Sequence, residues 1–290
     1  MFEIFRLQVH AILGSKKRWL VALLLTVPAV LTYVTMTFGG LGELRRTIEA
    51  NDGQFVVGEV DQIRIEGPDG EVHERTRIAF DLPWQTVGAI YLFLLYPQML
   101  CMLLALLYGS SLLGSELDGK TITYLFTRPI PRWHFVVGKF LAIVAVLLPP
   151  TAVSLAVSWQ LLGGPGGVQL LGAQLASVFG SLLAYNAVFV LIGFIVPRRA
   201  MVVALIYGVV FEFLLSFVPA IVNTFAVTYY LRSIVVEMLQ LEVPHEIARI
   251  VGDASLPAAI GSVLAITVVG LGGASMLAAR REYVVADEAT

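Results

Sequence analysis

The sequence predicts an all-α polytopic membrane protein with six transmembrane helices, an N-terminal interfacial helix and a small extracytoplasmic β-hairpin loop. Three observations predict it: an apolar composition, long apolar segments, and an uneven distribution of basic residues between the loops. Of the 290 residues, 58% are hydrophobic and 14% are charged, whereas a soluble domain has about 45–50% apolar and about 25% charged residues. A chain this apolar cannot bury its hydrophobic surface in one water-soluble core, so lipid must be its solvent over much of its length.

Charge and cysteine content exclude some function classes. The net charge of −2 is too balanced to indicate a nucleic-acid partner. The single cysteine, Cys101, excludes an internal disulfide. Met99 and Met102 lie beside it, and such soft side chains can bind copper, but they are also ordinary packing residues of a membrane helix. We favour packing, and we expect this chain to bind no metal and no other cofactor itself.

Six apolar segments are expected to span the bilayer, since a helix needs about 20 apolar residues to cross the hydrocarbon core. They cover residues 19–38, 87–113, 135–161, 171–196, 201–220 and 257–279. Together they define a transmembrane domain over 19–279. Pro28, Pro97 and the pair Pro149-Pro150 fall inside spans, where a proline kinks a helix and neighbouring groups must satisfy the freed carbonyls.

The basic residues predict the orientation. Twelve lie on the side of the N-terminus: Arg6, Lys16, Lys17, Arg18, Lys120, Arg128, Arg132, Lys139, Arg198, Arg199, Arg280 and Arg281. Seven lie on the other side: Arg45, Arg46, Arg64, Arg75, Arg77, Arg232 and Arg249. Because cytoplasmic loops carry the excess of Lys and Arg, we expect a multi-pass protein of the cell inner (plasma) membrane. Both termini would be cytoplasmic, with 280–290 as a cytoplasmic tail.

Residues 1–18 are expected to form a cytoplasmic interfacial amphipathic helix. Phe2, Phe5, Val9 and Ile12 follow one another at spacings of three, four and three, which puts them on one face of a helix. A basic run, Lys16-Lys17-Arg18, follows this helix and suits the headgroup layer. A frayed tail is the alternative.

Residues 40–85 are expected to form an extracytoplasmic loop that contains a hairpin. Ile63 and Ile65 precede a Pro68-Asp69-Gly70 turn and Val72 follows it, while 54–60 is a further candidate strand. We favour a simple cap, although a receptor or substrate-capturing role is open. The glycine-rich stretch 163–167 on the same side is expected to be a tight turn between helices.

Residues 221–256 are expected to form broken outer helices. The stretch 229–241 is amphipathic and too charged to span, and Pro244-His245-Glu246 opens a second short helical stretch at 247–251. Such segments lie at the outer interface or enter the membrane partway, where surrounding protein protects their backbone.

The stretch GSELDGKT, residues 114–121, matches the nucleotide-binding pattern G-x-x-x-x-G-K-[ST]. A working phosphate loop follows a buried strand and opens a helix, whereas this stretch follows the inner end of a predicted membrane helix. Glu116 and Asp118 occupy two of the four variable positions and would repel a triphosphate. We therefore interpret the match as accidental and expect no ATP binding by this chain.

The same inner segment, 114–134, resembles the type-2 family of ATP-binding-cassette (ABC) exporter permeases. The residues that carry the resemblance are Glu116, Gly119, Thr121, Leu125, Pro129, Arg132, Gly138 and Lys139. The predicted architecture is also similar to that family: an interfacial first helix, six spans, both ends inside, and broken outer helices before the last span. One residue separates Gly119 from Thr121, and the outer loop 40–85 is longer than in compact members of the family.

The resemblance implies a permease subunit that pairs with a second copy or a near relative and with separate ABC ATPase subunits. ATP and Mg would be bound by the ATPase, and catalysis would lie there. The segment 114–134 would be the coupling segment. The residues expected to couple are Glu116, Gly119, Thr121, Tyr124, Leu125, Phe126, Pro129, Arg132 and Lys139. Their apolar and aromatic members suit a protein groove; a solvated connecting loop is the alternative.

Glu212 is the one carboxylate well inside an expected span, about 13 residues and so roughly 20 Å from Arg199 at 1.5 Å per residue. An intramembrane acid is costly and usually faces protein or water. Contact with substrate and simple packing against a neighbour such as Asn186 or Tyr185 are both open, and we place these three residues on a candidate substrate path.

Other function classes remain as alternatives. A secondary transporter would need an ion-coupling path, for which Glu212 stands nearly alone in the membrane. An intramembrane hydrolase would need a metal or nucleophile cluster, but the four histidines are scattered and no H-E-x-x-H occurs. A membrane anchor of an ABC-type complex for gliding or cofactor maturation fits the resemblance equally well. Relatives of this design handle lipids, drugs, polysaccharides, peptides and maturation factors, so the sequence does not select a substrate.

Overall fold

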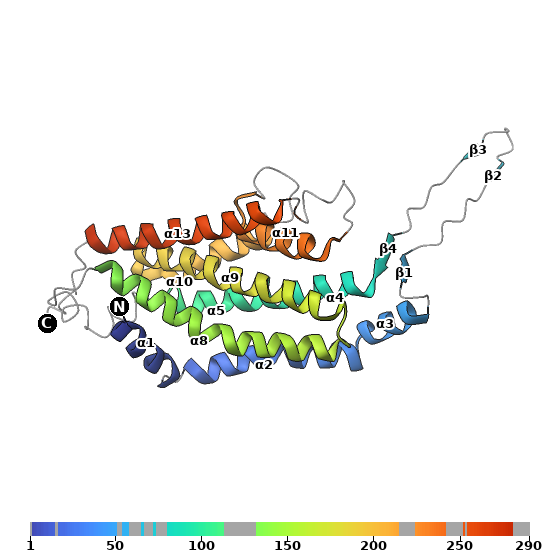
Figure 1. The fold of residues 1–290 in the computed structure, drawn as a ribbon, viewed down its shortest axis with the longest axis horizontal. Coiled ribbons are helices and arrows are strands. Elements are labelled where there is room, and N and C mark those ends of the chain that lie inside the picture. The colour runs from blue at the N-terminus through green and yellow to red at the C-terminus, as the bar shows by residue number, and fades with distance from the viewer. Residues whose placement is uncertain are drawn as a thin grey trace.

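The computed structural model describes residues 2–14, 17–50, 54–57, 65–66, 72–73, 80–112, 132–214, 224–241, 252 and 254–280. The described chain forms an elongated bundle whose long helices run side by side, with a strand-containing extension at one end (Figure 1). The first part contains α1 (Phe2–Gly14), α2 (Lys17–Thr37), α3 (Gly40–Ala50), β1 (Gln54–Val57), β2 (Ile65–Glu66), β3 (Val72–His73), β4 (Phe80–Pro83), α4 (Trp84–Phe93), η1 (Leu94–Leu100) and α5 (Cys101–Tyr108). The second part contains α8 (Arg132–Leu161), α9 (Gly167–Ile195), η2 (Pro197–Arg199), α10 (Ala200–Tyr207), η3 (Gly208–Leu214), α11 (Val227–Leu239) and α13 (Leu256–Arg280).

Five helices in the described part of the chain are long and apolar enough to cross a membrane. They are Trp19–Thr37, Trp84–Tyr108, Trp133–Leu161, Gly167–Ile195 and Leu256–Arg280. Each overlaps one of the predicted spans, and together they agree with an all-α polytopic membrane protein. The remaining predicted span, 201–220, is helical from α10 through η3 as far as Leu214. Residues 215–220 lie outside the described residues, so a sixth span stays a prediction.

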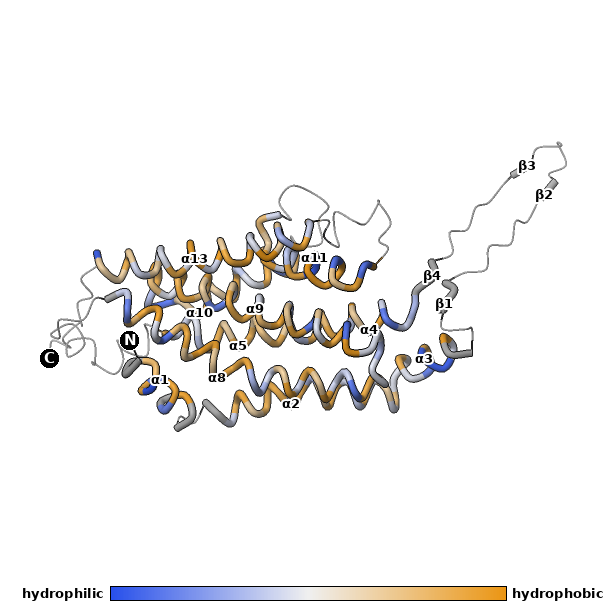
Figure 2. Tube along the Cα trace, in the orientation of Figure 1, coloured by the Kyte–Doolittle hydropathy of each residue, from blue (hydrophilic) through white to orange (hydrophobic). Residues whose placement is uncertain are grey.

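The helix ends gather at two opposite ends of the bundle (Figure 1). One end holds α1, the end of α5, the beginning of α8 and the end of α13, and the other holds α3, β1, β4, the beginning of α4 and α11. Figure 2 shows that apolar residues run along most of the bundle helices, whereas α3 carries several polar residues. The described helix ends are therefore divided between two ends of the bundle, as the predicted topology requires. The assignment of the first end to the cytoplasm stays a prediction from the distribution of charge.

Helix α9 is the centre of the bundle. It packs against α5, α8, α11 and α13 and is the most buried of the five candidate spans. Small residues allow this close packing. A Cβ atom at Gly270 of α13 would lie 3.0 Å from the main-chain oxygen of Ala187, and one at Gly193 would lie 2.9 Å from the main-chain oxygen of Ser110. The contacts of α9 with its neighbours therefore depend on backbones that approach each other directly.

The first helix has the amphipathic form that the sequence predicts. Helix α1 packs mainly against α8. Ile12 is buried and Phe5 and Val9 are half-buried, while Arg6 and His10 are exposed. Residues 2–14 of the predicted 1–18 are thus helical, while Lys17 and Arg18 belong to α2, and the described residues of the apolar face are buried or half-buried. Its position in the membrane interface stays a prediction.

The predicted extracytoplasmic loop contains one helix and two antiparallel strand pairs among its described residues. β1 pairs with β4, with Gln54 opposite Pro83, and β2 pairs with β3, with Ile65 opposite His73. The predicted turn at Pro68-Asp69-Gly70 lies outside the described residues. Helix α3 was not predicted.

The turn between α8 and α9 is held by side chains of neighbouring segments. Gly163, Gly164, Gly166 and Gly167 all have positive φ values, a conformation that glycine adopts without strain. Trp84 Nε1 donates to the main-chain oxygen of Leu162 at 3.3 Å. The tight turn expected at 163–167 is therefore present, and it is fixed against α4.

Helix α11 corresponds to the predicted amphipathic stretch 229–241. It packs against α9 and α13 rather than standing apart from the bundle, and Leu231, Ile234 and Val235 are buried. Ser177 Oγ of α9 also donates to the main-chain oxygen of Leu231 at 3.4 Å. The second predicted outer stretch, 247–251, lies outside the described residues.

Candidate functional site

Most of the predicted coupling residues lie outside the described residues: Glu116, Gly119, Thr121, Tyr124, Leu125, Phe126 and Pro129. The structure describes Leu112, which precedes the coupling segment, and residues 132–134 at its end. Arg132 begins α8, and the chain leaves α5 through a turn that reaches Leu112. Lys139 lies one to two turns into α8 and is buried, with its Nζ 4.7 Å from the ring centroid of Phe135. This geometry fits a cation–π contact.

Glu212 is the centre of a buried polar cluster. It belongs to the π-helical segment η3 and its side chain is 0% exposed. Five groups can donate hydrogen bonds to its carboxylate. One oxygen accepts from Tyr207 Oη at 2.9 Å and from the N–H of Val227 at 3.0 Å. The other accepts from Tyr185 Oη at 3.3 Å and from Thr228, whose N–H and Oγ1 lie at 2.9 and 2.8 Å. The carboxylate is thus satisfied by protein groups from α9, α10 and α11.

Two of these donors are the first N–H groups of α11. The N-terminal N–H groups of a helix have no partner within the helix, and α11 is preceded by Ala226, with no side-chain capping hydrogen bond. Glu212 supplies the missing acceptor from a different segment of the chain. A carboxylate at this position also interacts favourably with the helix dipole, whose positive end lies at the N-terminus. Glu212 therefore caps α11 from outside the helix.

Tyr185 and Asn186, the two neighbours proposed for Glu212, have different hydrogen-bond partners in the structure. Tyr185 Oη lies 3.3 Å from the carboxylate and 2.9 Å from Thr228 Oγ1, and because each hydroxyl has one hydrogen, one of the two donates to Glu212 and the other to either neighbour. Asn186 Nδ2 instead donates to the main-chain oxygen of Leu182 at 2.7 Å, and its Oδ1 has no hydrogen-bond partner in the described part of the chain. Only Tyr185 belongs to the Glu212 cluster.

Gln98, which the sequence does not single out, connects the cluster to the second span. Its Nε2 donates to the main-chain oxygen of Glu212 at 3.3 Å, and its side chain is buried. Gln98 follows Pro97 within the π-helical segment η1. Single-turn π segments are frequent at functional sites. Here a π segment of the second span contacts a π segment of the fifth predicted span through this hydrogen bond.

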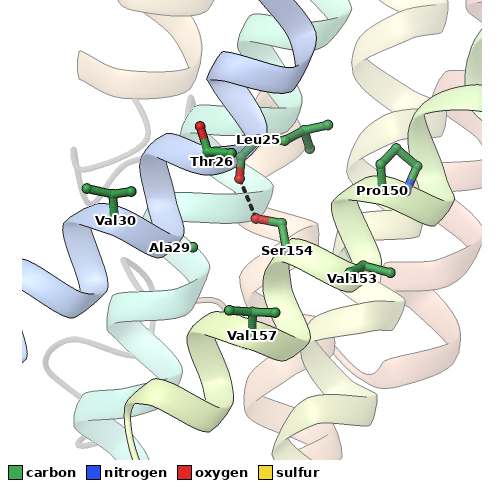
Figure 3. A pocket seen from close by; sticks show the side chains of 8 residues that line it. All are labelled: Leu25, Thr26, Ala29, Val30, Pro150, Val153, Ser154 and Val157. Atoms are coloured by element: carbon green, nitrogen blue, oxygen red, sulfur yellow. Dashed lines mark hydrogen bonds between the residues drawn. The ribbon is translucent and has the colours of Figure 1, made fainter.

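Tyr96, on the other side of Pro97, connects the second span to the third. Its hydroxyl lies 2.7 Å from the main-chain oxygen of Ser154 and 2.7 Å from Ser158 Oγ. Ser154 Oγ then donates to the main-chain oxygen of Leu25 in α2 at 2.6 Å, as Figure 3 shows. The segment η1 is thus hydrogen-bonded to the fifth predicted span through Gln98 and to the third span through Tyr96.

An open apolar cavity of about 550 Å³ lies between α2 and α8 (Figure 3). Its lining residues are Leu25, Thr26, Ala29, Val30, Pro150, Val153, Ser154 and Val157. The two polar side chains among them already donate hydrogen bonds within the protein. Thr26 Oγ1 donates to the main-chain oxygen of Leu23, and Ser154 Oγ donates to that of Leu25. This surface presents hydrocarbon to its surroundings. Among the described residues, no group of three or more His, Cys, Asp or Glu side chains is arranged to hold a metal ion.

These features define a class of protein: a helical integral membrane protein with buried polar contacts between its spans. The model of the family described as ABC-2 family transporter protein matches residues 3–250. Because the match covers most of the chain, the protein belongs to the ABC-2 transporter family, the family that the inner segment resembles. Members are membrane permease components of ABC transporters, and membership implies partnership with ABC ATPase subunits. No curated protein and no solved structure matches the chain.

Proposed function

We propose that this chain is the transmembrane permease subunit of an ABC exporter, which couples ATP hydrolysis in a separate nucleotide-binding subunit to movement of a substrate out of the cell. The observation that carries the proposal is the family match over residues 3–250, which includes the whole coupling segment 114–134. ATP and Mg are bound by the partner ATPase. The chain itself changes conformation and performs no chemistry.

The place of the coupling segment supports this function. It lies in the sequence between α5 and α8, and Figure 1 shows that the end of α5 and the beginning of α8 lie at the same end of the bundle. A displacement of the segment therefore acts directly on the second and third spans. Tyr124, Leu125 and Phe126 supply apolar and aromatic anchors for a groove in the ATPase. Glu116 and Arg132 can set the register by charge pairing.

The contacts of Tyr96 support the transmission of this movement. Its hydroxyl joins η1 of the second span to Ser154 and Ser158 of the third. Because these hydrogen bonds are buried, breaking them leaves polar groups without partners in a medium of low dielectric constant. The second and third spans are therefore expected to move together when the ATPase closes on ATP and opens after hydrolysis.

A second copy of this chain, or a near relative, completes the transporter in this proposal. The spans in α2 and α13 are the least buried of the five candidates. Their exposed apolar side chains, such as Leu23 and Val268, are suited to lipid or to the helices of a second permease. The substrate would be moved along the interface between the two copies.

The proposal is tested by reconstituting the chain in lipid nanodiscs with a candidate ABC ATPase, starting with the one encoded nearest to it. ATP hydrolysis is then compared for the ATPase alone and for the complex. We expect the complex to form and to hydrolyse ATP at a rate different from that of the ATPase alone. Leu125→Asp should abolish this difference, and Ile63→Asp, a matched change in the opposite loop, should preserve it. An ATPase whose rate is the same with and without the chain would contradict the proposal.

A further inference from the structure

The hydrogen bonds of Glu212 define a continuous connection between the inner end of the bundle and an outer helix. The second span begins at α4, passes through η1, and ends with α5, which leads directly into the coupling segment. From η1, Gln98 donates to the main chain of Glu212. From Glu212, the side chain accepts hydrogen bonds from the first two N–H groups of α11. Figure 1 shows α11 at the end of the bundle opposite to the beginning of α8.

We propose that Glu212 is a positioning residue that transmits movement of the second span to α11, so that α11 shifts when the coupling segment is displaced. This inference rests on the proposed function, because it needs a partner that moves the second span. The hydrogen bond from Gln98 would transmit the movement to η3. The cap on Val227 and Thr228 would transmit it to α11.

Three features make Glu212 suited to this task. It is fully buried, so water cannot replace the protein groups that hold it. Its carboxylate accepts hydrogen bonds from three different segments, so it cannot move without changing the contacts of α11. Its π-helical segment begins four residues earlier at Gly208, where a Cβ would lie 2.9 Å from Met102 Sδ of the second span. The two spans therefore approach each other at Gly208 as well as at Glu212 itself.

The same features argue against a direct contact between Glu212 and substrate. Each carboxylate oxygen is already engaged by at least two donors within the protein. A ligand would have to displace the cap of α11 in order to bind there. The structure thus favours a positioning role over the substrate contact that the sequence left open.

The test measures distances between spin labels in the complex with the ATPase, with and without trapped nucleotide. Cys101→Ala removes the single cysteine. An inner pair, Trp133→Cys with Met276→Cys, reports on α8 against α13. An outer pair, Phe38→Cys with Glu237→Cys, reports on α11 against the end of α2. All four labelled side chains are exposed.

Two variants interrupt the connection at different points. Gln98→Leu removes the donor from the second span and leaves the cap of α11 intact. Glu212→Gln replaces one carboxylate oxygen by an NH2 group, which cannot accept a hydrogen bond, so one of the two N–H groups of α11 loses its acceptor. The matched control is Gln174→Leu, because Gln174 is also a buried glutamine that donates to a main-chain oxygen of the second span, that of Ala89 at 2.8 Å, without contacting Glu212.

Nucleotide should change both distances in the otherwise unaltered complex. In Gln98→Leu and Glu212→Gln, the change in the inner pair should persist and the change in the outer pair should be lost, while Gln174→Leu keeps both. If the outer distance changes with nucleotide in both variants as it does in the unaltered complex, the role of Glu212 is overturned but the proposed function is not. The same conclusion follows if the outer distance never changes while the inner distance does. An inner pair that does not respond would overturn the proposed function as well. If Glu212→Gln does not fold, Gln98→Leu decides the result.

Discussion

The hydroxyl of Tyr96 lies 2.7 Å from the main-chain oxygen of Ser154, and this contact joins two spans at the point where each contains proline. Pro97 follows Tyr96 in η1, and Pro149 and Pro150 precede Ser154 in α8. Prolines remove hydrogen bonds from a membrane helix, and neighbouring helices can satisfy the freed groups. The second span is π-helical around Pro97, whereas α8 continues as an α-helix through its proline pair, and the contact of Tyr96 with Ser154 joins the two spans there.

Tyr96→Phe should destabilise the folded protein, because it removes the hydroxyl and leaves Ser154 and Ser158 without this partner. Hydrogen bonds between membrane helices contribute about 0.6 kcal/mol on average and about 1.7 kcal/mol at most. Thermal unfolding in detergent should therefore show a lower midpoint. Tyr33→Phe is the control, since Tyr33 is 54% exposed on α2. Equal midpoints for the two variants would show that the Tyr96 contact contributes nothing.

Gly270→Leu should disrupt the packing of α13 on α9. A Cβ at this position would meet the main chain of Ala187 at 3.0 Å, and overpacking of this kind costs about 1–3 kcal/mol. Gly272→Leu is the matched control in the same helix, because nothing lies within 4 Å of its Cβ position. The amount of protein that elutes as a monodisperse peak in size-exclusion chromatography should decrease for Gly270→Leu only. A similar loss for both variants would contradict the close contact.

Glu212→Ala should expose the N-terminus of α11. Removal of the carboxylate leaves the N–H groups of Val227 and Thr228 without their acceptor. Hydrogen exchange at the amides of Val227 and Thr228, followed in peptides that begin several residues before them, should become faster. Tyr207→Phe removes one donor and keeps both N–H contacts, so its exchange should stay close to that of the unaltered protein. Unchanged exchange in Glu212→Ala would contradict the cap.

The purified chain should neither bind nor hydrolyse ATP, although GSELDGKT matches a phosphate-binding pattern. The acidic side chains of Glu116 and Asp118 oppose a triphosphate. A fluorescent ATP analogue should show no saturable binding to the chain alone, and Lys120→Ala should change nothing. Saturable binding that is lost in Lys120→Ala would show that the pattern is functional.

The spans were predictable because their signal is local. The expected segment 135–161 corresponds to Trp133–Leu161, and 171–196 corresponds to Gly167–Ile195. The length of an apolar run suffices to place such a helix. Helix α3 was missed because its eleven residues begin with glycines and include Glu43, Arg45 and Arg46, a composition that is typical of a loop.

The partners of Glu212 were only partly predictable because they depend on tertiary structure. Tyr185 and Asn186 are adjacent in α9, and one residue turns a helix by about 100°, so only one of them can face Glu212. Tyr207 lies five residues from Glu212, and residues five apart are not neighbours on a regular α-helix. Gln98 lies 114 residues away. The absence of a capping side chain at Ala226 was the one local signal that α11 needs an acceptor from elsewhere.

The most direct test of the central claim is a cross-link between the coupling segment and an ABC ATPase. A photoreactive residue at position 125 is compared with one at position 63, in the opposite loop, in intact membranes that contain both proteins. We predict an ATP-sensitive cross-link from position 125 to the ATPase and none from position 63. A cross-link from position 63 and none from position 125 would contradict the account. So would the absence of a cross-link from both positions in membranes where the chain and the ATPase are shown to form a complex.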